Sequence, residues 1–282
     1  MQAYHSSAMN PRLPTLFRVV ASVELLVLGV TGFGLFLLPT LASSQWPWQV
    51  PLFNTYFLAA VYISSFAAVT VLLWGGHWAP ARLGLWMLVF FTTLVLIISV
   101  VYLDRFDFHK WATWGWFFLY IVIPLNSVYN LYLYRHLQPA NPMPIPSLLK
   151  WYLLVQTVVL GLYTLALLLA PVASTAFWPW HIDEFHGRMY SAIFLTGAVG
   201  AFVLWRSAAA VELLLLGATQ SSLGFFAILG LVIADATEHR VNWTQPGTWA
   251  WIALFAVLLL TGVVMIVLSL GKRPVRLQEQ EG

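Results

Sequence analysis

Eight stretches of this sequence are long and apolar enough to cross a lipid bilayer, and they constrain the fold more than any other feature. A helix needs about 20 apolar residues to span the hydrocarbon core. Hydrophobic residues make up 61% of the chain and charged residues 8%, against about a quarter charged in soluble proteins. The sequence therefore predicts an all-α integral membrane protein with eight transmembrane helices, at residues 15–38, 52–75, 82–103, 112–134, 148–171, 184–206, 212–234 and 247–270.

The second half of the chain repeats short motifs of the first half in the same order. LLVLG at 25–29 matches TVVLG at 157–161, WPW at 46–48 matches WPW at 178–180, and TWGW at 113–116 matches TWAW at 248–251. This order predicts a tandem duplication of a four-helix unit. Because four is an even number, both units enter the membrane from the same side as a parallel repeat. We expect units at 1–138 and 148–271, a proline-rich cytoplasmic linker at 139–147 and a cytoplasmic tail at 272–282.

Lysine and arginine are distributed unevenly between the two expected membrane faces. Nine lie on the face that holds both termini and four on the other: Arg12, Arg18, Arg82, Arg135, Lys150, Arg206, Lys272, Arg273 and Arg276, against Arg105, Lys110, Arg188 and Arg240. Cytoplasmic loops carry the positive excess, so we expect a multi-pass protein of a bacterial inner membrane with both termini cytoplasmic. The expected partners are the lipid bilayer and either other membrane subunits or an apolar ligand. No basic patch interleaved with aromatic residues points to nucleic acid.

The two WPW segments differ in charge. Tryptophan is abundant near the expected helix ends, so an interfacial aromatic belt explains Trp178 and Trp180, with a ligand-binding aromatic box as the alternative. Aligned on WPW, Pro51 of the first copy falls on Asp183, and both residues suit a helix start. A second interpretation is a metal site, because His181, Asp183 and His186 supply imidazole and carboxylate groups that bind zinc, manganese or iron.

Arg188 is expected about one turn inside the sixth helix, where a cation needs a partner or access to the interface. Asp235 at the outer end of the seventh helix is the first candidate partner, and Glu184 is the second. The equivalent residue of the first copy is Tyr56, which we expect in the interfacial belt.

The segment from Trp178 to Arg188 resembles a family of uncharacterised bacterial polytopic membrane proteins. In that family W-P-W precedes an arginine at the start of a helix, and a later G/T-x-W segment begins the last helix. Trp178, Pro179, Trp180, Arg188 and Trp249 match this pattern, whereas HIDEFHG replaces the family's threonines and proline. The resemblance implies no activity.

Among the polar residues expected inside the membrane, four are candidate site residues: Glu24, Gln156, Gln220 and Asn126. Glu24 and Gln156 occupy equivalent positions of the two units, which predicts that both face the core between the units. Glu24 is either a functional group or a residue near the interface, paired with Arg18. Gln220 and Asn126 fit hydrogen bonding between helices or a substrate path.

Several functions lack the residues that they require. The histidines all fall at expected helix ends or in loops, no lysine lies mid-helix and there is no cysteine, so we expect no transmembrane b-type haem, no retinal and no Fe–S cluster. There is no P-loop, G-x-S-x-G or G-x-G-x-x-G motif. We therefore favour a non-enzymatic membrane protein, either a scaffold or accessory subunit or a binder of an apolar ligand at its outer face. The alternatives are a transporter or channel for a small neutral or lipidic solute between the repeats and, third, a metal-dependent enzyme at the outer face.

Overall fold

A computed structural model describes residues 10–137 and 143–271 of the chain. Within these ranges eight helices are long and apolar enough to span a membrane. They are α1 (Thr15–Leu37), α3 (Leu52–Gly75), α4 (Trp78–Val101), α5 (Trp111–Leu133), α6 (Ser147–Leu169), α8 (Glu184–Arg206), α9 (Ala210–Glu238) and α10 (Pro246–Gly271). The predicted all-α membrane fold is therefore confirmed. The tail at 272–282 and part of the expected linker lie outside the described residues.

The helix boundaries differ from the expected ones most at α4 and α9, and α9 ends at Glu238, four residues later than expected. Helix α4 begins at Trp78, four residues earlier than expected, because Pro80 is compatible with a first helical turn. Two short helices, α2 (Pro39–Gln45) and α7 (Pro171–Ser174), follow α1 and α6. Each begins with the proline that ends the long helix before it, so the chain turns toward the WPW segments.

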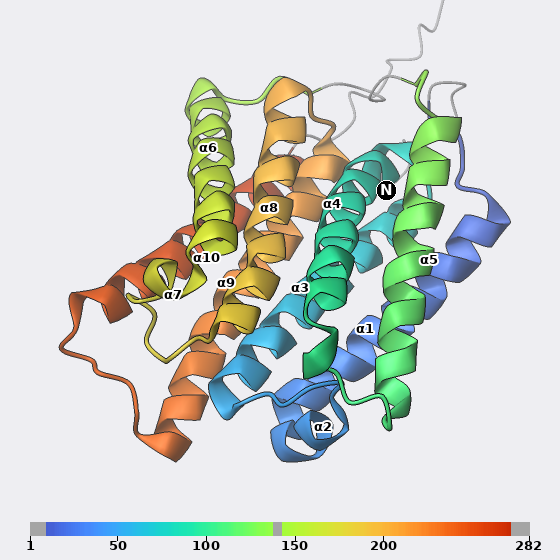
Figure 1. Cartoon of the computed structure of the whole chain (residues 1–282). Helices are drawn as coiled ribbons and strands as arrows, with labels where there is room; N and C mark the ends of the chain where they lie inside the picture. Colours follow the sequence, from blue (N-terminus) through green and yellow to red (C-terminus); the bar gives the residue numbers. More distant parts are fainter. Residues whose placement is uncertain (1–9, 138–142, 272–282) are drawn as a thin grey trace, which may run out of the picture.

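The long helices form two layers. Extensive packing joins α1 to α3, α3 to α9 and α9 to α10 in one layer, and α5 to α4, α4 to α8 and α8 to α6 in the other. Figure 1 shows the second layer as a row in front, with the first running obliquely behind it. Helices α3, α4, α8 and α9 are the inner helices of the bundle, and most of the buried residues lie on them.

The helix contacts of one half have counterparts in the other half. In this correspondence α1 matches α6, α3 matches α8, α4 matches α9 and α5 matches α10. The α1–α3 contact corresponds to α6–α8, α4–α5 to α9–α10, and α3–α9 to α8–α4. Local contacts repeat as well: Trp114 Nε1 donates to the carbonyl of Phe108, and Trp249 Nε1 to that of Trp243. A tandem duplication would produce these paired contacts, although the duplication itself stays a prediction.

Glycine allows the backbones of α9 and α10 to touch. A Cβ added at Gly217 would lie 2.7 Å from the carbonyl oxygen of Gly262, and one at Gly262 would lie 2.7 Å from that of Gly217. Such small residues let membrane helices approach closely enough for dispersion contacts, which replace the missing hydrophobic driving force.

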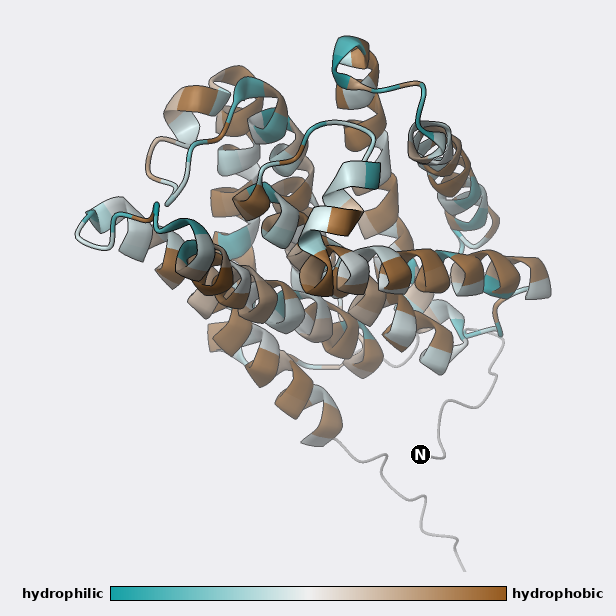
Figure 2. Cartoon of the chain, turned by 90° about the horizontal axis from the view of Figure 1, so that it is seen from below, coloured by the Kyte–Doolittle hydropathy of each residue, from teal (hydrophilic) through white to brown (hydrophobic). Residues whose placement is uncertain are grey.

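The two ends of the bundle are formed by different segments. The end with both WPW segments, here the WPW end, also carries α2, α7 and the α4–α5 and α9–α10 loops. Figure 2, which views the bundle from below, shows hydrophilic residues mainly in connecting segments and hydrophobic residues along the long helices. The opposite end, here the terminal end, holds the starts of α1 and α4, where Leu13 N donates to the carbonyl of Gly76 at 3.1 Å. The assignment of either end to the cytoplasm stays a prediction.

Candidate functional site

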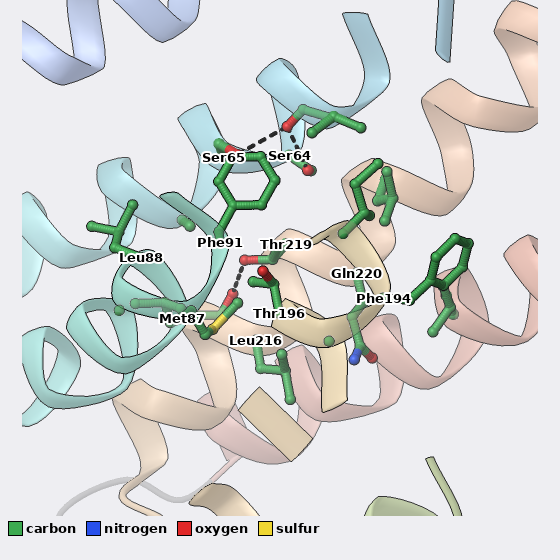
Figure 3. Close-up of a pocket in the computed structure, with 18 of the residues that line it drawn as sticks. Ser64, Ser65, Met87, Leu88, Phe91, Phe194, Thr196, Leu216, Thr219 and Gln220 are labelled. Carbon is green, nitrogen blue, oxygen red and sulfur yellow. Dashed lines mark hydrogen bonds between the residues drawn. The ribbon is translucent and has the colours of Figure 1, made fainter. Parts of the chain in front are cut away.

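A cavity of about 90 Å³ lies between the inner helices, close to the middle of the bundle. All four inner helices contribute to its wall, together with α6 and α10 (Figure 3). Most of the lining is aliphatic or aromatic, including Leu72, Phe91, Phe194 and Leu216. A volume of about 30 Å³ corresponds to one water molecule in the liquid, so the cavity suits a small solute or the polar part of a larger molecule.

Two glutamines bring hydrogen-bonding capacity into this apolar cavity. Gln156 is the tenth residue of the 23-residue α6, and Gln220 lies on α9; they are 5% and 4% exposed. The amide nitrogen and oxygen of both side chains have no hydrogen-bond partner within the described chain. An unpaired amide in apolar surroundings costs a few kcal/mol. Hydrogen bonding between the described helices therefore does not account for either glutamine.

Four hydroxyl groups complete the polar lining. Ser64, Ser65, Thr196 and Thr219 each donate to a carbonyl of their own helix, at distances from 2.7 to 3.0 Å. Figure 3 shows Ser64 and Ser65 sharing one carbonyl and Thr219 bonded along α9. Their hydrogens are thus engaged, but each oxygen keeps lone pairs that can accept a hydrogen bond. The cavity therefore offers glutamine donors and acceptors together with hydroxyl acceptors.

No ionisable side chain appears among the described residues that line the cavity. A charged ligand would lose its hydration without gaining a counter-ion, which costs several kcal/mol or more. The lining is thus chemically matched to an uncharged molecule that has both an apolar part and a carbonyl, hydroxyl or amide group.

Crossed hydrogen bonds between the halves close the bundle at the WPW end. Trp48 Nε1 donates to His186 Nε2 of α8 at 3.1 Å, and Trp180 Nε1 donates to Asn54 Oδ1 of α3 at 2.7 Å. Each acceptor is the eighth residue after the first tryptophan of its own WPW segment. We call these two contacts the WPW latches. They join the two layers, and sequence reasoning missed Asn54, although alignment on WPW pairs it with His186.

The latch at His186 fixes the form of its imidazole ring. Since Trp48 donates to Nε2, that nitrogen carries no hydrogen, and the proton lies on Nδ1, which donates to Asp183 Oδ1 at 2.7 Å. Asp183 is also the N-cap of α8 and accepts from the backbone N–H of His186 at 2.8 Å, which confirms its expected helix-start role. Partial burial opposes its ionisation, but the bonds from His186 outweigh that effect and lower the pKa of Asp183 to about 2.

The WPW tryptophans form an aromatic layer, and three of the four are buried. Trp46, Trp48 and Trp178 are 7%, 4% and 4% exposed. The ring of Trp48 lies 4.8 Å from that of Trp116, and the equivalent Trp180 lies 5.3 Å from Trp251. The burial of Trp178 therefore contradicts the belt interpretation for that ring, whereas Trp180 is only partly buried and its belt role stays a prediction.

An ion pair joins α4 to α9 at the terminal end. Arg82 on α4 donates to both carboxylate oxygens of Glu212 on α9, at 2.7 and 2.8 Å, and to the carbonyl of Ser207 at 2.9 Å. Glu212 is fully buried and also accepts from the backbone N–H of Ala209. Sequence reasoning missed this pair. The available signal was that Arg82 and Glu212 both lie in the first turns of helices that begin at the same end.

Arg188 pairs with the second of its two expected partners. It lies 2.5 Å from Glu184 of its own helix, donates to Tyr102 Oη and binds the carbonyl of Leu168 near the end of α6 at 3.1 Å. Asp235 of α9, the preferred candidate, instead accepts from Val241 N and Trp243 Nε1 of the loop that follows α9. The preference for Asp235 was wrong because Arg188 faces α6 and the end of α4.

The histidines and acids of the second WPW segment do not converge. His181 is exposed, while both ring nitrogens of His186 are used by Asp183 and Trp48. Across residues 10–137 and 143–271, no group of three His, Asp or Glu side chains could hold a metal ion. The geometry therefore gives the metal hypothesis no support.

Glu24 and Asn126 lie beside a separate, smaller cavity among α1, α3, α4 and α5. Asn126 accepts from Asn130 of its own helix at 3.1 Å. Within the described part of the chain, Glu24 forms no ion pair with Arg18 or any other residue. The expected pairing with Arg18 is not present, and only Gln156 of the two equivalent residues lines the central cavity.

Comparisons with known protein families, with curated proteins and with solved structures give no match.

Proposed function

We propose that this membrane protein is a carrier for a small uncharged solute that has both apolar and hydrogen-bonding groups. The observation that supports this proposal is the pair of buried glutamines, Gln156 and Gln220, whose four amide atoms lie unpaired at a mid-bundle cavity. In lipid the unpaired state is costly, so a ligand that completes their hydrogen bonds would be bound selectively.

The polar contacts between the layers at both ends of the bundle support transport over simple binding. The cavity lies between the WPW latches at one end and the Arg82–Glu212 pair at the other. Gly84 and Leu215 of the lining are each within one helical turn of that ion pair. A carrier alternates between openings to the two sides, and a state closed at both ends is an intermediate that such a cycle requires.

The experiment uses the full chain reconstituted into liposomes. After a hyperosmotic shock with glycerol, urea or acetamide, light scattering measures how fast the vesicles reswell as solute enters. The proposal expects at least one solute to enter faster than it enters protein-free liposomes. Each Gln→Leu change should weaken binding about fivefold, corresponding to one lost hydrogen bond of about 1 kcal/mol.

The double variant Gln156→Leu/Gln220→Leu is the control, and thermal unfolding checks that it is folded. The carrier would be contradicted if all three solutes entered wild-type liposomes no faster than protein-free liposomes and none of them changed the unfolding temperature of the wild type.

A second candidate is binding of an apolar ligand at the WPW end. A hollow of about 650 Å³ opens there, lined by Phe53, Trp178 and Trp180, with Glu238 and Arg240 also on its wall. Its size falls within the range of about 300–1,000 Å³ usual for ligand sites. A brominated fatty acid that binds in the hollow should quench tryptophan fluorescence, and Trp180→Phe should reduce that quenching. Equal quenching in Trp180→Phe would contradict this site.

A further inference from the structure

Glu24 is a carboxyl group in the middle of a membrane helix with no cation beside it. It is the tenth residue of the 23-residue α1, about 14 Å from the start of that helix. The equivalent Gln156 lies at the tenth residue of α6. A carboxylate at this depth is costly unless it is paired, so its position calls for a specific account.

The side chains that face Glu24 are uncharged. The small cavity beside it is lined by Val69 and Leu72 of α3, by Leu85 and Leu88 of α4 and by Ile123, Asn126 and Ser127 of α5. The phenol of Tyr120 on α5 is the titratable group among the described residues that interacts electrostatically with Glu24. These surroundings favour the neutral acid, which can both donate and accept a hydrogen bond.

Helix α5 presents two polar side chains at this cavity. Ser127 Oγ is buried and has no hydrogen-bond partner in the described ranges. The amide side chain of Asn126 lines the same cavity. A protonated Glu24 therefore faces groups with which it can form hydrogen bonds, whereas an ionised Glu24 would find no cation.

A thin apolar wall separates Glu24 from the central cavity. Val69, Leu72 and Leu88 line both cavities. A movement of α3 or α4 that opens the central cavity toward the terminal end would therefore also change the surroundings of Glu24. Water admitted by such an opening could take up the proton of Glu24.

We propose that Glu24 is a proton-binding site that couples solute movement to proton movement. This inference rests on the proposed carrier function. The state closed at both ends forms only when the Glu24 carboxylate has bound a proton from water as –COOH. When the bundle opens to the other side, the group returns that proton to water. Each crossing of the solute thus carries one proton in the same direction.

The first test is chemical labelling of the purified full chain with dicyclohexylcarbodiimide, an apolar reagent that adds to protonated carboxyl groups. Peptide mass spectrometry should find the adduct on Glu24 and none on Glu212, whose carboxylate is held by Arg82. Above the titration midpoint of Glu24 the rate should fall about tenfold per pH unit, as the protonated fraction does. Absence of an adduct on Glu24 from pH 5 to 8, or a rate independent of pH, would overturn the inference.

The second test follows protons in liposomes that contain the pH-sensitive dye pyranine. An inward gradient of a solute that the wild-type chain admits, glycerol, urea or acetamide, should acidify the lumen. Glu24→Gln, which places an amide at both equivalent positions, should still transport this solute but without acidification. Acidification by Glu24→Gln equal to that of the wild type would overturn the coupling. Absence of entry of all three solutes in the wild type would instead count against the carrier, while the labelling result still decides whether Glu24 binds protons.

Discussion

The two WPW segments make equivalent contacts with different chemistry. At one latch Trp180 donates to the amide oxygen of Asn54, and at the other Trp48 donates to the imidazole of His186. An amide oxygen accepts at any pH between 2 and 12, whereas a histidine nitrogen accepts only when it carries no proton. The second segment therefore needs Asp183 to hold the proton on the opposite ring nitrogen.

The difference between an amide acceptor and an imidazole acceptor explains why the charged residues lie in one segment only. Asn54 needs no supporting group, and Pro51 starts α3 without a side-chain cap. Asp183 both caps α8 and orients His186, while Glu184 holds Arg188 beside the end of α6. Asp183, Glu184, His186 and Arg188 thus each have a local structural partner.

The largest expected difference in stability is between variants of Tyr56 and Arg188, which occupy equivalent positions of the two segments. Tyr56 is 7% exposed, packs on Phe36 and lies against Gly230, so it is a core residue and not the interfacial ring expected from the sequence. Tyr56→Ala should cost about 3 kcal/mol, as for other large buried side chains. Arg188→Ala should cost about 1.5 kcal/mol, because its partner Glu184 is half exposed. Unfolding by SDS in mixed micelles measures both, and a larger cost at Arg188 would contradict this order.

The next difference separates the two latches. His186→Ala removes a buried ring and leaves Trp48 Nε1 without an acceptor, so we expect a loss of about 2 kcal/mol. Asn54→Ala removes a smaller side chain and one acceptor, with a loss of about 1 kcal/mol. His186→Asn is the matched control, since it gives both segments the same acceptor type. The same SDS titration applies, and equal losses for the two alanine variants would show that the latches are energetically equivalent.

The smallest effect is the pH dependence that Asp183 contributes. Its pKa is about 2 in the folded protein and 3.8 for the unperturbed group. A lowered folded pKa stabilises the protein above the unfolded value, so this contribution is complete above about pH 4 and is lost as the pH falls toward 2. The side chain is 40% exposed, so we expect only about 0.5 kcal/mol. Asp183→Asn retains an N-cap, and its unfolding temperature should fall less than that of the wild type between pH 4 and pH 2. Parallel pH profiles would rule out this role.

Much of the fold was predictable because membrane helices are encoded locally. Bilayer thickness requires long apolar runs, and no buried backbone group can go without a hydrogen bond in lipid. The eight spans, the helix start at Asp183 and the correspondence between Pro51 and Asp183 follow from such local rules. The candidate site was only partly predictable: Gln156 and Gln220 stand out as polar residues in apolar helices, but their common cavity depends on how α6 and α9 pack.

The sequence by itself determined that the chain crosses the membrane in eight helices and that its halves carry equivalent motifs. Only the tertiary structure decided that each layer combines helices from both halves. It also decided the contacts between the layers, in which Trp48 donates to His186, Trp180 donates to Asn54 and Arg82 pairs with Glu212. The physical reason is that lipid is as apolar as the helix surfaces, so hydrophobicity inserts a helix without selecting its neighbour. Close backbone approach, aromatic packing and a few buried polar pairs select that neighbour, and they join residues more than a hundred positions apart.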